Sequence, residues 1–152
     1  MKINVLGLGY IGLPTALLLA SSGHDVVGID IDEQKVERLR KGEMPFKEPG
    51  LEELYEEAKD NFKPASELEK ADAFILAVPT PLDRSINVAD LNSVKQASNM
   101  IYPYLEEGNL VILESTVPPG TSKNLVLPIL KKSGLEKDEF YLVHSPERAI
   151  PG

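Results

Sequence analysis

Three glycines near the N-terminus have a spacing suited to binding a diphosphate. Gly7, Gly9 and Gly12 form the pattern G-x-G-x-x-G, which follows the apolar run 3–6 and precedes an apolar, Ala/Leu-rich stretch. A strand, a tight turn and a helix in this order bring backbone N–H groups and the positive end of the helix dipole to an anion. Gly7 permits the turn, Gly9 leaves room for a pyrophosphate, and Gly12 allows the helix to pack close to the strand. The predicted dinucleotide site also includes the residues between the last two glycines, Tyr10 and Ile11.

A carboxylate follows where the adenosine ribose of a dinucleotide is expected. Asp30 ends the predicted second strand, 25–29, at about the 20-residue spacing typical of this fold. Its carboxylate would accept hydrogen bonds from both ribose hydroxyls and repel a 2′-phosphate, which favours NAD over NADP. Lys35 lies one turn into the next helix and either reaches the same ribose or is a plain surface lysine. The alternative interpretation is an ordinary glycine turn followed by an aspartate that caps a helix.

Composition restricts the classes of function. The 152 residues suit one domain with one sizeable core. A formal net charge of −8 argues against a nucleic-acid partner, which needs a basic face. The chain has no cysteine, hence no disulfide and no thiolate nucleophile, and His24 and His144 are too few for a metal cluster. No apolar run is long enough to span a membrane and the N-terminus leads straight into a strand, so we expect a cytoplasmic protein without a signal peptide.

Apolar runs alternate with amphipathic stretches along the whole chain, which predicts an α/β fold. Strands are expected at 3–6, 25–29, 61–65, 73–78, 110–113 and 140–143. Helices are expected at 10–22, 33–41, 51–59, 90–105 and 121–132, with a short further helix opened by the capping-box pattern Ser66 to Glu69. Thr121 is the expected cap of the last helix. The predicted architecture is a Rossmann-type, doubly wound parallel sheet of about six strands in the order 3-2-1-4-5-6, with Pro64 confining its strand to the sheet edge.

Three unusual loops follow successive strands on the side that the glycine motif marks for binding. They span 78–81, 114–120 and 144–152, and two of them are stiffened by paired prolines. Thr80 is expected against the dinucleotide. Ser115 and Thr116 place hydroxyls where the nicotinamide end should lie, or else form an ordinary Ser/Thr turn.

With these loops in view, the chain resembles the N-terminal domain of the UDP-glucose/GDP-mannose dehydrogenase family over essentially its whole length. The matching segments are Gly-Leu-Gly-Tyr-Ile-Gly (7–12), Gly-Ile-Asp (28–30), Glu-Pro-Gly-Leu (48–51), Ala-Val-Pro-Thr-Pro (77–81), Glu-Ser-Thr-Val-Pro-Pro-Gly-Thr (114–121) and Ser-Pro-Glu-Arg (145–148). The first motif occurs in many dehydrogenases, whereas the last three in this order are much more specific. The ending Ser-Pro-Glu-Arg-Ala-Ile-Pro-Gly resembles the branch that acts on UDP-N-acetylhexosamines, above all UDP-N-acetylmannosamine.

The resemblance implies NAD-dependent oxidation of a sugar C6 alcohol to a carboxylate, with two NAD reduced per turnover. The aldehyde would be carried on a cysteine as a thiohemiacetal, oxidised to a thioester and hydrolysed. By position, Thr116 would lie near the reacting carbon and a catalytic water, and Glu147 would position that water or take its proton. Arg148 would contact the sugar or its diphosphate, or form a structural ion pair. A full-length protein would be a homodimer or a higher homo-oligomer.

The chain departs from the family pattern because the nucleophilic cysteine is missing. Thiohemiacetal and thioester chemistry cannot occur without a thiolate. We therefore expect residues 1–152 to form an NAD-binding domain that is inactive alone, with the family's central and C-terminal sugar-nucleotide domains absent. The alternatives are a UDP-N-acetylglucosamine or UDP-glucose 6-dehydrogenase, a stand-alone NAD-binding or sensing module, and another Rossmann dehydrogenase of the 3-hydroxyacyl-CoA or 6-phosphogluconate type.

Overall fold

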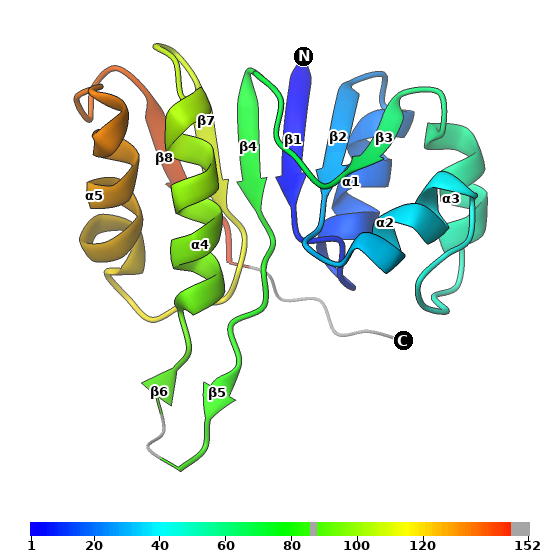
Figure 1. Cartoon of the computed structure of the whole chain (residues 1–152), viewed down its shortest axis with the longest axis horizontal. Helices are drawn as coiled ribbons and strands as arrows, with labels where there is room; N and C mark the ends of the chain where they lie inside the picture. The colour runs from blue at the N-terminus through cyan, green and yellow to red at the C-terminus, as the bar shows by residue number, and fades with distance from the viewer. Residues whose placement is uncertain (86–87, 147–152) are drawn as a thin grey trace.

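A computed structural model describes residues 1–85 and 88–146 and shows a six-stranded sheet between two layers of helices (Figure 1). The strands of the sheet are β1 (Lys2–Leu6), β2 (Asp25–Ile29), β3 (Phe62–Ala65), β4 (Ala73–Leu76), β7 (Leu110–Leu113) and β8 (Tyr141–His144). All neighbouring pairs are parallel, and the order is β3-β2-β1-β4-β7-β8. When the six strands are numbered within this sheet alone, their order is 3-2-1-4-5-6. The predicted Rossmann-type fold is therefore confirmed.

The helices begin and end close to the predicted positions. They are α1 (Gly12–Ser21), α2 (Glu33–Arg40), α3 (Leu51–Ala58) and α4 (Asn92–Ile101), the last continued by a 3₁₀ turn at Tyr102–Tyr104. Gly23 and Gly42 follow α1 and α2 with φ angles of 88° and 77°, a region that favours glycine, and so stop these helices. Asp32 caps α2 as predicted, since its Oδ1 accepts the N–H groups of Gln34 and Lys35.

The central strands β1 and β4 are buried on both faces, which explains their nearly continuous apolar runs. On one face, Ile3, Val5 and Ile75 pack against α1 and α3. On the other face, the side chains of alternate strand residues such as Leu6 and Phe74 pack against α4 and α5 (Leu127–Leu130). Strand β3, which carries Pro64, pairs only with β2 and forms one edge, as predicted.

The short helix predicted from Ser66 to Glu69 is wrong, because this segment is a bend and an irregular stretch. The capping box needs the Glu69 carboxylate to turn back toward Ser66. Glu69 instead forms ion pairs with Lys2 of β1 and Lys63 of β3, and its carbonyl oxygen accepts the side-chain amide of Asn4. Contacts with the neighbouring strands therefore override the local pattern.

The last helical segment also differs from its prediction. It begins as a π-helix at Ser122–Val126, continues as α5 and ends in a 3₁₀ turn at Lys131–Ser133. Pro128 lacks the N–H that an uninterrupted α-helix would need, and a wider turn before it avoids the clash of its ring. Thr121 does not act as a cap, because its dihedral angles are helical and its hydroxyl donates back to the carbonyl oxygen of Pro118.

A small antiparallel hairpin follows β4 and was not predicted. Its strands are β5 (Leu82–Asp83) and β6 (Val88–Ala89), and it projects beyond the carboxyl edge of the sheet just before α4 (Figure 1). The loops after β1, β2, β4 and β7 meet at this same edge, which is where open parallel sheets bind their ligands.

Candidate functional site

A cavity of about 660 Å³ lies at the carboxyl edge of the sheet, where the strand order reverses between β1 and β4. Its walls come from the ends of β1, β2, β4 and β7 and from one side of α4. The predicted site residues that line it are Gly7, Gly9, Tyr10, Ile11, Asp30, Lys35, Thr80 and Thr116. One continuous cavity therefore brings together residues from four loops that are far apart in the sequence.

The turn between β1 and α1 gives each glycine a different geometry. Gly7 has a φ of 95°, and its N–H donates to the carbonyl oxygen of Ile29 at 2.8 Å. A Cβ added to Gly12 would lie 1.8 Å from the carbonyl oxygen of Gly7, so Gly12 packs inside the turn and does not line the cavity. A Cβ added to Gly9 would meet no atom within 4 Å, and it would project into open space beside the cavity.

The N-terminus of α1 has no side-chain cap. Ile11 occupies the cap position without a side-chain hydrogen bond, and the first turn carries no acidic residue. The first N–H groups of a helix need acceptors, and the helix dipole makes this end positive. An anion at the cavity would satisfy both requirements, so the turn fits a dinucleotide's diphosphate.

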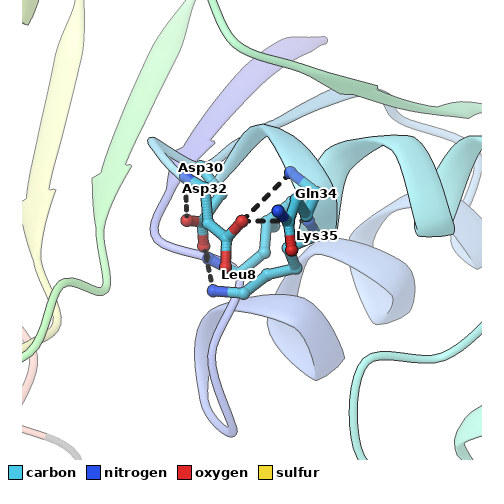
Figure 2. Close-up of polar contacts among 5 residues, drawn as sticks. All are labelled: Leu8, Asp30, Asp32, Gln34 and Lys35. Atoms are coloured by element: carbon cyan, nitrogen blue, oxygen red, sulfur yellow. Dashed lines mark hydrogen bonds and ion pairs between the residues drawn. The ribbon is translucent and has the colours of Figure 1, made fainter.

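Asp30 is held firmly at the end of β2, as Figure 2 shows. Its side chain is 8% exposed. Oδ2 accepts the Leu8 N–H at 2.9 Å and the Lys35 ammonium at 2.6 Å, and Oδ1 accepts the Asp32 N–H at 3.0 Å. Burial by itself raises the pKa of this carboxyl, but the Lys35 ammonium and the two backbone donors outweigh it and lower the pKa of Asp30 below its ordinary value. The carboxylate is therefore charged at neutral pH.

The loops after β4 and β7 are tied together at the other end of the cavity. The Thr80 hydroxyl donates to the carbonyl oxygen of Thr116 at 2.7 Å. The Ser115 hydroxyl lies 2.6 Å from the carbonyl oxygen of Val78, and it is buried. Ser115 thus uses its hydroxyl to join the two loops, whereas Thr116 is exposed at the cavity wall.

Several lining residues were not singled out from the sequence. Glu114, at the end of β7, faces Thr15 of α1, with 3.4 Å between the threonine hydroxyl and Oε1. Helix α4 contributes Ser93, Gln96 and Met100, on the side of the helix that faces the cavity. Glu114 directly precedes the predicted Ser115–Thr116 pair and could have been found from its place in that loop. The α4 residues carry no sequence signal, because their position depends on how the helix crosses the sheet.

Two predicted residues, Glu147 and Arg148, lie outside the described residues. Within 1–85 and 88–146, no group of three or more His, Asp or Glu side chains is arranged to hold a metal ion. In the same part of the chain, no helix combines the length and the apolar character needed to cross a membrane.

Comparisons with known proteins identify the family of the chain. The model of the NAD-binding domain of the UDP-glucose/GDP-mannose dehydrogenase family matches residues 1–152. UDP-N-acetyl-D-mannosamine dehydrogenase of Methanococcus vannielii is 45% identical over 99% of this chain and 35% of its own length. NDP-N-acetyl-D-galactosaminuronic acid dehydrogenase of Ralstonia nicotianae is 40% identical over 99% of this chain and 38% of its own. The solved structure of the UDP-N-acetyl-mannosamine dehydrogenase from Staphylococcus aureus superposes with a TM-score of 0.94 at 42% identity, covering 100% of this chain and 38% of that one. The chain thus spans little more than a third of the length of these relatives.

Proposed function

Because the chain belongs to the UDP-glucose/GDP-mannose dehydrogenase family, we propose that it is the NAD-binding domain of a UDP-N-acetylmannosamine 6-dehydrogenase. The family and its cofactor follow from the match over residues 1–152 and confirm the resemblance seen in the sequence. The sugar nucleotide and the full reaction are the proposed part. The observation that carries the proposal is the single cavity that joins an uncapped helix N-terminus, a buried carboxylate and the two paired loops.

The cavity offers a distinct environment to each part of NAD. The adenosine ribose belongs at Asp30, and the diphosphate belongs at the turn around Gly9. The nicotinamide then reaches the loops after β4 and β7, beside Thr80 and Thr116. When bound there, the nicotinamide supplies the hydride acceptor for oxidation of the sugar alcohol. The chain's own part is to hold and orient the cofactor, with the exposed Thr116 facing the reacting carbon.

The sugar nucleotide is inferred from the relatives. Methanococcus vannielii and Staphylococcus aureus proteins named for UDP-N-acetylmannosamine are 45% and 42% identical to this chain. A relative named for an N-acetylgalactosaminuronic acid is almost as similar, at 40%, and makes another UDP-N-acetylhexosamine the second candidate. In either case, we propose that Glu147 acts on the catalytic water and that Arg148 binds the sugar nucleotide. A cytoplasmic location and a homodimeric or larger assembly of the full-length enzyme belong to the same proposal.

Turnover requires a nucleophile that these residues do not supply. The chain has no cysteine, and a thioester route needs a thiolate. We propose that the nucleophile and the remaining sugar-nucleotide site belong to domains outside residues 1–152. The 152-residue chain should then bind NAD without reducing it.

Three measurements test the proposal. Isothermal titration of the purified chain with NAD should show one site, and incubation with NAD and UDP-N-acetylmannosamine should produce no NADH absorbance. The full-length gene product should reduce NAD with UDP-N-acetylmannosamine in preference to UDP-glucose. No NAD binding, or rapid NAD reduction by the 152-residue chain, would contradict the proposal. Preference for another UDP-N-acetylhexosamine would contradict only the sugar assignment.

A further inference from the structure

The Asp30 carboxylate has almost no free acceptor capacity. A carboxylate offers about four lone-pair positions. Three are in use: Oδ2 accepts from the Leu8 N–H and the Lys35 ammonium, and Oδ1 accepts from the Asp32 N–H. An adenosine ribose that presents two hydroxyls to Asp30 needs two positions. One of the present donors must therefore give way.

Lys35 is the donor that can move. The Leu8 and Asp32 N–H groups are backbone groups fixed by the β1–α1 turn and by the start of α2, so they cannot leave (Figure 2). The Lys35 ammonium lies at the end of a flexible four-carbon chain, and the Lys35 side chain is 25% exposed. When a ribose takes its place on Oδ2, the ammonium remains within reach of the ribose hydroxyls.

The other acid at this end, Asp32, is engaged by the backbone through one of its two oxygens. Asp32 Oδ1 accepts the N–H groups of Gln34 and Lys35 at 3.0 and 3.2 Å, and this holds it at the start of α2. Among the described contacts, the Lys35 ammonium forms its ion pair with Asp30. Without Asp30, the ammonium would lose this partner while Lys35 still lines the cavity, next to the position of a 2′-phosphate of NADP.

We propose that Lys35 is a latent binding site for a 2′-phosphate and that its ion pair with Asp30 prevents this binding. The preference for NAD over NADP then depends on both Asp30 and Lys35, and not on Asp30 alone. This inference rests on the proposed NAD site. With Asp30 present, a 2′-phosphate meets a carboxylate and finds the lysine already paired. With Asp30 absent, the same phosphate gains a charge-assisted hydrogen bond from the ammonium.

A double-mutant cycle tests the inference. NAD and NADP are titrated calorimetrically into the wild-type chain, Asp30→Ala, Lys35→Met and the double variant. Asp30→Ala should raise NADP affinity. The increase should be at least about tenfold greater when Lys35 is present than when it is replaced by Met, as expected for one charge-assisted hydrogen bond. Lys41→Met removes the same charge from the other end of α2, where Lys41 pairs with Glu37, and should leave the gain unchanged.

The outcomes separate this inference from the proposed function. Equal gains in NADP affinity with and without Lys35 would overturn the latent site while leaving NAD binding intact. If the wild-type chain binds neither dinucleotide, the proposed function fails as well. Because Asp30 is buried and accepts backbone bonds, Asp30→Asn serves as a second variant that keeps one acceptor oxygen, and circular dichroism checks that every variant is folded.

Discussion

Gly12 lies so close to Gly7 that no side chain fits between them: an added Cβ would be 1.8 Å from the Gly7 carbonyl oxygen and 3.0 Å from the Cβ of Ala77. The contact joins the first residue of α1 to the first residue after β1. It places the helix N-terminus at the cavity, and it is made by backbone atoms that cannot rotate away. Gly12 thus acts on the fold, and only through the fold on the cofactor.

Gly12→Ala should therefore destabilise the domain. The methyl group collides with backbone, and overpacking of this kind costs about 1–3 kcal/mol or more. Urea unfolding followed by circular dichroism measures the loss. Gly9→Ala is the matched control, since its methyl group meets no atom within 4 Å and should leave the urea midpoint nearly unchanged. Equal midpoints for the two variants would contradict the packing role of Gly12.

Gly9→Val should weaken NAD binding without destabilising the domain. Its side chain enters open space beside the cavity, so the domain should fold, but the pyrophosphate could no longer approach the turn. We expect NAD affinity to fall by at least about tenfold, or 1.4 kcal/mol. Calorimetric titration gives the affinity and thermal unfolding without NAD gives the stability. A folded Gly9→Val domain with wild-type NAD affinity would show that the diphosphate binds elsewhere.

Thr80→Val should loosen the link between the loops after β4 and β7. The variant loses the hydrogen bond to the Thr116 carbonyl oxygen, which should cost about 1 kcal/mol of stability. NAD affinity should also fall several-fold, because both residues line the cavity. Thr121→Val removes an equally short hydroxyl-to-carbonyl bond outside this cavity and should cost stability without changing NAD affinity. If both variants keep wild-type NAD affinity, the link has no part in binding.

The affinity for NAD should be nearly constant from pH 8 to about pH 5. Burial opposes the charge on Asp30, but Lys35 and two backbone donors outweigh it and place the pKa of Asp30 below its ordinary value of 3.8. The carboxylate of the folded chain therefore stays charged throughout this range, and its contribution to NAD binding should be lost only as the pH falls through the lowered pKa. Titrations at several pH values check this, and a loss of affinity centred near pH 6 would point to a different group.

Acid should weaken the sheet through Glu69. Hydrogen bonds from Lys2 and then from Lys63 lower its pKa from 4.5 to about 2. The contribution to stability is therefore present above pH 4.5 and is lost as the pH falls toward 2. A third of the side chain is exposed, so we expect a contribution of about 1 kcal/mol or less.

Thermal unfolding at pH 6 and pH 3 tests this contribution. Glu69→Gln should lower the unfolding temperature at pH 6 and narrow the difference between the two pH values. Glu67→Gln, at an exposed neighbouring position, should preserve the wild-type difference. A Glu69→Gln variant that loses as much stability in acid as the wild type would contradict the role of Glu69.

Residue chemistry made the sheet and the glycine turn predictable. An apolar run such as that of β1 favours a buried strand, and Gly7 can adopt the positive φ that the turn requires. The strand, the turn and the helix therefore follow from the local sequence. Asp32 was found as a cap for the same reason, because its bonds reach only two or three residues along the chain. The carboxyl edge of a parallel sheet then fixed the place of the cavity.

Long-range contacts explain what the sequence did not reveal. Glu69 matched a capping box, but its partner Lys2 lies 67 residues away in the chain and in an adjacent part of the sheet. The pairing of Lys35 with Asp30 depends on side-chain conformations that the spacing leaves open. Gln96 and Met100 reach the cavity only because of the path of α4 across the sheet. Glu147 and Arg148 remain predictions.

The position of β1 has a consequence for how the domain forms. The first strand of the chain pairs on both sides, with Val26 and Ala73 among the partners of Ile3. The other strands of this six-stranded sheet lie outward from it, toward β3 on one side and toward β8 on the other. Deleting residues 1–6 would thus divide the sheet into two separate halves, whereas losing β8 would remove only its outermost member. The strand that leads into the glycine motif is thus also the strand that connects the two halves of the sheet.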